Sequence, residues 1–470
     1  MYPDWVNKHK TEGTNISKIS GHYYLYEVCS VWSKEKGRAQ KITKRYLGRI
    51  TEEGLMPPKR RRTPSAGITT KEYGASNLIT ELGEDILTKL REVFGDHHGN
   101  VVFAIAVTRL LERCPFKRVE LVYINSFISE TLKDLKLSNN NLSGFLKRFG
   151  GDRERIVEFL KYFIGDNPHI IFDGTGIVSK SEKMNINRQG YKRKGTYETQ
   201  FKLLYVFSCD KKMPAYYRII SGNIADISAL KLSLDEANIK DAVVVADKGF
   251  SSDDNCSDME ALGIKYIVPL KRNSSLIDYK KLETGNKSSF EGFFMFNERP
   301  IWYYQCGNVT VCVDNDLKTE EEKSYLWNIE RKVDGYTKEG FIERQYRFGV
   351  IALRSNTGKT PREIYYLYKE RMEIEQSFDF LKNLLEQDRS YMQNEKSLET
   401  WAFINHITLL LNYKIYKLLR DKELLSKYSV ADVIAHFKYI SKIKFDGEWH
   451  LSEVTKKTRE LAVALGIHIT

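Results

Sequence analysis

The sequence predicts a multidomain α/β protein, and its length and two changes of pattern support that prediction. At 470 residues the chain is too long for one compact core, so two to four domains are expected. Short apolar runs typical of buried strands begin at His169 and recur to Leu270. Helical spacing dominates from residue 76 to about 150, and it returns from residue 361 onward. The expected architecture is a mixed-sheet α/β core flanked by an N-terminal β-hairpin with a helical region and by C-terminal helices.

The N-terminal part alternates aromatic and β-branched residues with polar ones over residues 22–50, which predicts a β-hairpin with a basic second strand. Three prolines and four consecutive basic residues mark a linker at 56–67, so we expect a first region at 1–66. Helical spacing from Ser76 to Phe94, with Ser76 as N-cap and Gly95 as stop, opens a helical region at 67–160.

Within that helical region, the polar run Ser138–Asn141 separates two short apolar helical patterns. This arrangement is typical of a DNA-reading helix-turn-helix and equally of a plain corner in a helical bundle, so both interpretations stay open.

The core is expected in two parts separated by an insertion. Strands are predicted at 169–173, 201–207, 215–220, 242–246, 264–270 and 348–353, with helices at 226–236 and 361–386. The resulting regions are a first part of the core at 165–270, a β-rich insertion at 271–345, a second part at 346–390 and a helical region at 391–470.

The positive charge of the chain, +12 in total, is concentrated in two segments. Residues 34–62 carry eleven Lys and Arg against three Glu, and residues 180–195 carry six against one Glu. Such clustering favours a polyphosphate partner, because neutralising phosphates supplies most nucleic-acid affinity. A solvated basic loop is the alternative for either segment. Neither segment is an amphipathic helix, which argues against a membrane surface.

The six cysteines contain no Cys-x2-Cys pair, so neither a disulfide framework nor a zinc ribbon is indicated. The first residues lack the apolar core of a secretory signal, and the apolar runs are too short to span a membrane. We therefore expect a cytoplasmic protein with no membrane partner.

Two aspartates follow apolar strand runs. Asp173 ends His169–Asp173 and precedes Gly-Thr-Gly, and Asp247 follows Val243–Ala246 and precedes Lys-Gly-Phe. Carboxylates at strand ends of an α/β sheet are usual ligand-binding groups, and neighbouring strands would bring these two together. Taken singly, each could instead cap a turn.

The predicted helix 361–386 places Tyr368, Arg371, Glu375 and Lys382 in one stripe about 60° wide at 100° per residue. The apolar face beside it is formed by Leu367, Ile374, Phe378, Leu381 and Leu385. Packing that face on the sheet would aim the polar stripe at the sheet's edge. A solvated helix face is the alternative, but it would show charge pairs all round.

These four residues carry a resemblance. The spacing Tyr368-x2-Arg371-x3-Glu375-x6-Lys382 resembles the signature of the DDE insertion-sequence transposases that cut through hairpin intermediates. The segments beginning Asp173-Gly-Thr and Asp247-Lys-Gly-Phe resemble the motifs around the family's two aspartates, and Ser221-Gly-Asn with Asp226 resembles a segment between them. The resemblance covers about 165–390; the remainder resembles the group more loosely.

The resemblance implies a ribonuclease-H-like core in which Asp173, Asp247 and Glu375 hold two Mg (or Mn) ions. Oxygen ligands without a supporting His or Cys cluster independently favour Mg or Mn over zinc. The implied reaction is metal-dependent cleavage at element ends through hairpins, followed by cut-and-paste strand transfer. Arg371 and Lys382 would neutralise phosphate near the cut, and Tyr368 would contact a distorted end.

The expected partners are double-stranded DNA, as element-end inverted repeats and as target, and a second copy of the chain in a synaptic homodimer. The expected place of action is the prokaryotic nucleoid. A basic loop between the first two strands is expected to track the DNA backbone, and a basic segment near the N-terminus and the 70–150 helices to read the ends. The residues concerned are Arg188, Lys192, Arg193 and Lys194 in the loop, and Lys41, Lys44 and Arg45 near the N-terminus.

Two alternative functions remain at this stage, a catalytically inactive DNA-binding relative and a structure-selective nuclease on the same scaffold. The presence of all three carboxylates favours an active enzyme, and Asp379 is the substitute carboxylate if Glu375 is not the third.

Overall fold

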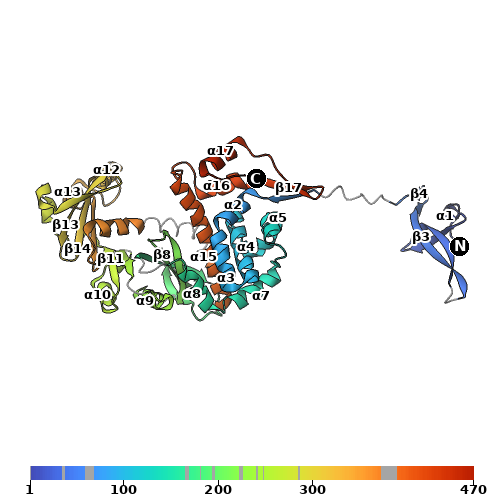
Figure 1. The fold of residues 1–470 in the computed structure, drawn as a ribbon, viewed down its shortest axis with the longest axis horizontal. Coiled ribbons are helices and arrows are strands. Elements are labelled where there is room, and N and C mark those ends of the chain that lie inside the picture. The colour runs from blue at the N-terminus through green and yellow to red at the C-terminus, as the bar shows by residue number, and fades with distance from the viewer. Residues whose placement is uncertain are drawn as a thin grey trace. The chain divides into compact units, whose positions relative to one another are not determined.

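The computed structural model describes residues 2–33, 37–58, 68–164, 169–179, 181–192, 196–221, 226–239, 242–246, 248–283, 286–371 and 389–469. The chain divides into two compact units (Figure 1), one formed by Met1–Thr69 with Lys444–Glu448 and the other by Thr70–Ile443 with Trp449–Thr470.

The first unit is an antiparallel sheet with a short helix packed against it. Its elements are α1 (Asp4–Asn7), β1 (Thr14–Ile19), β2 (His22–Ser33), β3 (Arg38–Thr51) and β4 (Gly54–Met56), in the order β1-β2-β3-β4. The core is small, with Val6, Ile16, Leu25 and Ile50 buried together. β2 and β3 pair antiparallel along their length, which confirms the hairpin predicted for this part of the sequence.

The second unit begins with a short strand and a helical region. The elements are β5 (Thr69–Glu72), α2 (Gly74–Leu82), α3 (Glu84–Phe94), α4 (Asp96–Glu112), α5 (Val119–Asn125), α6 (Ile128–Thr131), α7 (Asn139–Phe149) and α8 (Arg153–Lys161). The Asn run considered as a helix-turn-helix corner is the first turn of α7 rather than a turn before it.

The helix predicted from Ser76 to Phe94 is two helices, because the chain breaks at Gly83. A side chain there would meet Leu411 Cδ2 at 2.4 Å, so only glycine lets the segment approach α15 (Glu395–Asp421) so closely. The prediction of Ser76 as N-cap was wrong. The backbone N–H groups of Ala75 and Ser76 donate to the Glu72 carboxylate at 2.8 and 3.2 Å, so a glutamate upstream caps the helix.

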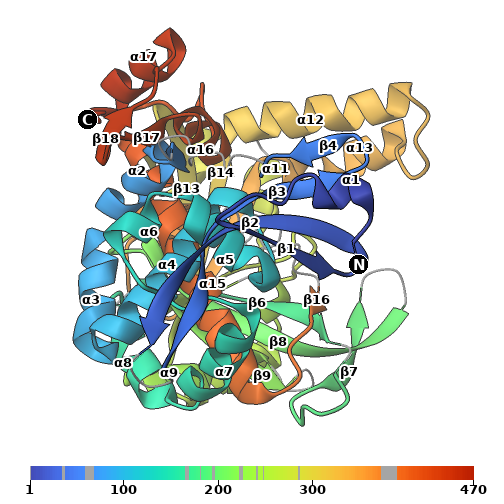
Figure 2. The ribbon, with the colours of Figure 1, turned by 90° about the vertical axis from the view of Figure 1, so that its right-hand side faces the viewer.

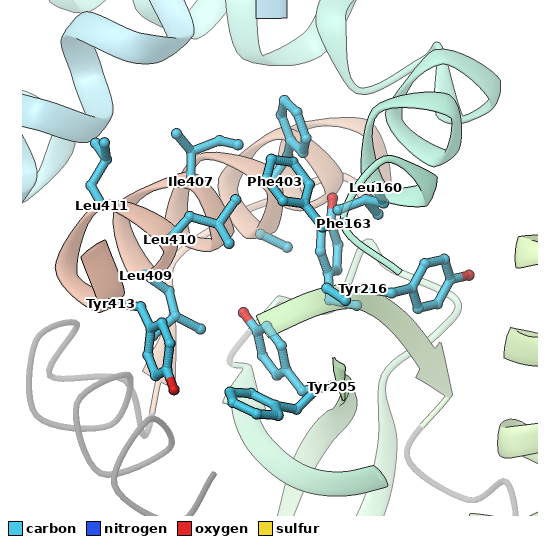
Figure 3. Packing of buried hydrophobic residues seen from close by; sticks show 14 of the residues in the cluster. Leu160, Phe163, Tyr205, Tyr216, Phe403, Ile407, Leu409, Leu410, Leu411 and Tyr413 are labelled. Atoms are coloured by element: carbon cyan, nitrogen blue, oxygen red, sulfur yellow. The ribbon is translucent and has the colours of Figure 1, made fainter. Parts of the chain in front are cut away.

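Helix α15 lies between the helical region and the sheet. It is buried on nearly all sides from Thr400 to Tyr413, because it packs against helices on one side and the sheet on the other, and its buried residues include the polar Asn405, His406 and Asn412. Figure 3 shows Leu411 and Ile407 directed toward the helical side and Leu409 and Tyr413 toward the strand that carries Tyr205. One hydrophobic core therefore runs through both layers.

The sheet of the second unit is large and mixed. Its strands are β6 (His169–Ser179), β7 (Arg188–Lys192), β8 (Thr196–Ser208), β9 (Met213–Ser221), β10 (Val243–Val245), β11 (Lys265–Pro269), β12 (Gly292–Phe296), β13 (Arg299–Cys306), β14 (Val309–Asp314), β15 (Val350–Ser355) and β16 (Arg389–Ser390). The main order is β12-β13-β14-β15-β11-β10-β6-β8-β7, with β9 on β8 and β16 on β6. β6, β10 and β11 run parallel, and β16 is parallel to β6. The predicted core strands are all confirmed, as is the helix after β9, α9 (Asp226–Ala237).

The insertion extends this sheet, because β14 pairs antiparallel with β15. The sequence indicated a β-rich segment, and the structure adds α11 (Lys280–Glu283), α12 (Asn315–Glu330) and α13 (Lys338–Arg344). α12 and α13 lie side by side (Figure 2), with the ring of Tyr325 5.8 Å from that of Phe341. Short 3-10 helices occur at Phe116–Arg118, Lys248–Phe250, Lys287–Ser289 and Gln345–Arg347, and α10 (Asp253–Ala261) precedes β11.

The C-terminal region was predicted to be helical throughout, and this was wrong in part. After α15 and α16 (Val430–Lys438) the chain forms a hairpin of β17 (Ser441–Phe445) and β18 (Glu448–Leu451) before α17 (Lys456–Leu465). β17 also pairs with β5, giving a three-stranded sheet.

Candidate active site

The two predicted catalytic aspartates are associated with neighbouring parallel strands: Asp173 lies within β6, and Asp247 comes two residues after the end of β10 in the sequence. β10 pairs with β6 in a register that sets Val243 opposite His169 and Val245 opposite Ile171. Asp173 stands two residues beyond Ile171, and its backbone pairs with Tyr205 of β8. Its side chain is not among those described, and Asp247 lies outside the described residues.

The expectation that Asp173 ends its strand was wrong, because β6 continues to Ser179. The glycines that follow it serve packing rather than a turn. A side chain at Gly174 would come within 2.7 Å of Leu204 Cδ2, and one at Gly176 within 2.7 Å of Gln200 Oε1, both on β8. Asp173 therefore stands in a glycine-containing strand that fits tightly against its neighbour.

Directly after the position of Asp247, the chain turns through a short 3-10 helix. Phe250 is buried there and meets Phe172 edge to face, with ring centroids 6.0 Å apart, so this turn is anchored beside β6. Next to it is a hollow of about 360 Å³ lined by Lys248, Lys271 and the serines at 251 and 252, among others. Ammonium and hydroxyl groups of this kind suit phosphate oxygens. Sequence reasoning did not identify Lys271 as a candidate site residue, because it belongs to none of the motifs around the predicted carboxylates.

The helix that carries the third part of the predicted site is described over residues 361–371, and two surfaces hold it. Ile364 is buried in the main core, where Leu367 and Tyr368 also pack. Tyr365 is fully buried against the insertion, with its ring 5.4 Å from Phe294 and 5.3 Å from Phe296. The helix is thus fixed between the sheet and the insertion.

Of the four signature residues, Tyr368 and Arg371 are half-buried on this helix, one turn apart. Glu375 and Lys382, with the substitute Asp379, lie outside the described residues.

A second hollow, of about 590 Å³, lies between the start of this helix and the insertion. Its wall includes Arg299, Asp314 and Lys369. Asp314 is 2% exposed; one carboxylate oxygen caps α12 and the other lies 3.3 Å from Arg299 Nη1. Burial lowers the pKa of the Lys369 ammonium, and the Asp314 charge opposes that shift. No local pattern in the sequence indicates this charged pocket, because its residues are separated by up to 70 positions.

The predicted DNA contacts fall in two places. Arg188 begins β7, so residues 188–192 of the segment expected to be a loop form a strand paired with β8. The Arg188 guanidinium donates to the backbone carbonyl of Asn187 at 2.8 Å. Lys192 belongs to β7 by its backbone, while Arg193 and Lys194 lie outside the described residues. In the first unit Lys41, Lys44 and Arg45 are exposed on β3.

Among the described residues no group of three His, Cys, Asp or Glu side chains could hold a metal ion. The three predicted ligands are not tested by that search, since none of their side chains is described. In the part of the chain that the structure describes, no helix is long and apolar enough to cross a membrane.

The large mixed sheet, with helices α9 and α10 in the connections between its strands, defines the second unit as an α/β domain. The family model described as "Transposase DDE domain" matches residues 164–411, more than half of the chain, and the protein belongs to that family. It is therefore a transposase, an enzyme that acts on DNA in transposition and DNA recombination, in a family that generally depends on divalent metal ions.

No curated protein matches the sequence. Among solved structures, the chain is similar to the cryo-EM structure of the piggyBac transposase synaptic complex with hairpin DNA, at 10% identity and a TM-score of 0.38, over 78% of this chain and 79% of that one.

Proposed function

We propose that this transposase excises and reinserts its element by a cut-and-paste route through hairpin intermediates, with Asp173, Asp247 and Glu375 as its catalytic carboxylates. The observation that carries the proposal is the family match over 164–411, because this interval contains all three residues. The core would be ribonuclease-H-like, formed by 165–270 and 346–390 around the insertion at 271–345.

Two features of the sheet support the choice of carboxylates. Ile171 of β6 and Val245 of β10 are directly paired on parallel strands. Asp173 comes two residues after Ile171, and Asp247 comes two residues after Val245. The segment that contains Glu375 is tied to the same sheet at both ends. Before it, residues 364, 367 and 368 pack in the main core, and after it β16 pairs with Val178 and Ser179 of β6.

The donor set fits hard divalent cations. Three carboxylates would supply oxygen ligands, which Mg²⁺ and Mn²⁺ prefer, whereas zinc favours sites with His or Cys. Asp173, Asp247 and Glu375 would hold two Mg (or Mn) ions, which when bound stabilise the attacking and leaving oxygens of an in-line displacement at phosphorus.

The chain's own basic and hydroxyl groups would hold the DNA backbone at the cut. We assign phosphate contacts to Arg371 and Lys382 and contact with the distorted end to Tyr368. Water first hydrolyses one strand and frees a 3′-OH at the element end. This hydroxyl attacks the phosphorus of the phosphodiester in the opposite strand, which forms the hairpin bond and releases the 3′-oxygen of the flanking DNA as leaving group. Water then reopens the hairpin, and the 3′-OH attacks target DNA. No covalent enzyme intermediate is needed.

Binding of the element ends is assigned to regions outside the core. The basic N-terminal region 1–66, with Lys41, Lys44 and Arg45, and the helices of 67–160 would recognise the inverted repeats. Arg188, Lys192, Arg193 and Lys194 would follow the backbone near the cut. The region 391–470 would follow the core as the C-terminal region. Two copies of the chain would pair the two element ends as a homodimer, and the reaction would occur at a prokaryotic nucleoid.

The test is cleavage of an end-labelled duplex that carries the element end, with Mg²⁺, by wild type and by Asp173→Ala, Asp247→Ala and Glu375→Ala. We expect hairpin-ended product from wild type and none from the three variants, with duplex affinity largely kept. Asp379→Ala is the matched control and should cleave normally. Cleavage by any of the three would reject that residue, and nicked or flush ends without hairpins would reject the proposed route in favour of a nuclease.

A further inference from the structure

The first unit contains a two-stranded ribbon that extends beyond the sheet. We define it as residues 28–33 of β2 and 38–43 of β3, paired from Val28 opposite Thr43 to Ser33 opposite Arg38. β1 pairs with β2 only as far as Glu27, and β4 pairs with β3 only from Arg49 onward. In the described part of the chain the ribbon therefore has no third strand on either edge.

The ribbon exposes large apolar side chains. Val31 is 47% exposed, Trp32 66% and Ile42 49%, and the core of the first unit includes no ribbon residue. A free two-stranded hairpin is marginally stable in water, and exposed apolar residues gathered on one element usually mark an interaction surface.

The same ribbon is basic on both faces. Partners opposite each other in an antiparallel pair share a face, and successive pairs alternate. Lys41 thus shares one face with Trp32, whereas Arg38 shares the other with Val31 and Ile42. Lys44 and Arg45 continue β3 at the base, and none of these four cations forms an ion pair within the described residues.

The geometry points to duplex DNA as the partner of this ribbon: we propose that it enters the major groove, with its cations on the phosphates of the two walls and Trp32 against base edges. Six paired residues per strand span about 20 Å. The groove is about 12 Å wide and about 8.5 Å deep, which admits a two-stranded ribbon, and apolar side chains there contact thymine methyl groups. Cations on both faces fit a cleft walled by phosphate on both sides better than a flat anionic membrane. This inference rests on the proposed recognition of element ends by the N-terminal region.

The test is binding of the full chain to a fluorescent 40-base-pair duplex that carries the element end, followed by anisotropy in EDTA over a salt series. Lys41→Gln with Lys44→Gln is compared with Lys8→Gln with Lys10→Gln, which removes the same charge from exposed positions of the same unit. We expect the ribbon variant to weaken binding about tenfold or more and to reduce the salt slope by about 2, since each phosphate contact contributes about 0.9. The control should change neither.

Trp32→Ala should weaken binding severalfold with the salt slope unchanged, and methylation of guanine N7, a major-groove atom, should interfere with wild-type binding. The proposal is overturned if the two lysine pairs behave alike, or if the ribbon variant binds the duplex as wild type does. Equal losses on single-stranded DNA of the same sequence, or ribbon-dependent binding to phosphatidylserine vesicles, also overturn it. Because binding is read in EDTA, a failure of the catalytic assignment leaves this result unaffected.

Discussion

Arg153 links its own helix to three other elements of the second unit, and replacing it tests how that unit is held together. Its guanidinium lies 2.7 Å from Glu236 of α9 and 2.7 Å from Glu399 of α15, and it donates to the backbone carbonyl of Tyr217 on β9 at 2.9 Å. Arg153 itself begins α8. One side chain therefore ties α8, α9, β9 and α15.

We predict that Arg153→Met lowers the free energy of unfolding by about 2 to 4 kcal/mol. Breaking a buried ion pair costs about 3 to 5 kcal/mol. The lower range applies because Arg153 and Glu236 are each 24% exposed and Glu399 is 16% exposed, so water screens the charges left behind.

The loss should depend on pH in a defined direction. Burial alone raises the pKa of Glu236, but Arg153 outweighs it, and the net pKa lies below the ordinary 4.5. A depressed carboxyl pKa stabilises the fold above the unfolded value, and that contribution disappears as pH falls through the folded value. The defect of Arg153→Met should therefore be largest near pH 7 and shrink below about pH 4.5.

The assay is urea unfolding followed by tryptophan fluorescence, at pH 7 and at pH 4. Adding Glu236→Gln and Glu399→Gln to Arg153→Met removes the stranded charges and should recover at least half of the loss. A loss under about 1 kcal/mol would show that Arg153 does not hold these elements together. A triple variant no more stable than the single one would show that the carboxylates left without a partner do not cause the loss.

Three further predictions concern stability. Burial raises the pKa of Glu72 to about 7, so the stability that its protonated carboxyl contributes is full below pH 4.5 and is lost as pH rises through 7. The free energy of unfolding of Glu72→Gln, measured by thermal melts, should exceed that of wild type by up to about 3 kcal/mol at pH 8 and by little at pH 4.5. Burial and, to a smaller extent, the charge of Arg153 lower the pKa of His406 to about 3, so the free energy of unfolding of wild type falls as pH drops below 6.5. His406→Phe lacks this loss, so its free energy of unfolding should rise by about 2 kcal/mol relative to wild type between pH 7.5 and pH 5. Gly174→Val, whose Cβ would sit 2.7 Å from Leu204 Cδ2, should cost about 1 to 3 kcal/mol in urea unfolding, and an unchanged midpoint would show that β8 yields easily.

The sequence predicted most of the core strands well because they are short, largely apolar runs, but it did not predict β7, whose residues Arg188–Lys192 are mostly polar. It missed α12, in which Tyr325 is the one buried residue, since a helix with so little buried surface has no apolar periodicity to detect. It also missed the β17–β18 hairpin, whose residues are mostly half-buried or exposed and carry Lys442 and Lys444 in place of an apolar face.

The candidate site was predicted in its motifs but not in its surroundings. Consecutive residues such as Asp247 with Lys248, or a helical stripe such as Tyr368 with Arg371, leave a local pattern that spacing reveals. The charged pocket of Arg299, Asp314 and Lys369 has none, because tertiary folding alone brings its members together. Asp173 was assigned to a strand end because two glycines follow it, yet these glycines reflect close packing on β8.

The proposed cleavage of DNA depends on metal binding by Asp173, Asp247 and Glu375. The most direct test is to replace each by cysteine and compare cleavage of the element end in Mg²⁺ and in Mn²⁺, because a thiolate binds Mg²⁺ poorly and softer ions better. We predict that each cysteine variant is inactive in Mg²⁺ and regains cleavage in Mn²⁺, while the alanine variants stay inactive in both. Equal activity of a cysteine variant in the two metals, or cleavage by the matching alanine variant, would contradict metal binding by that residue.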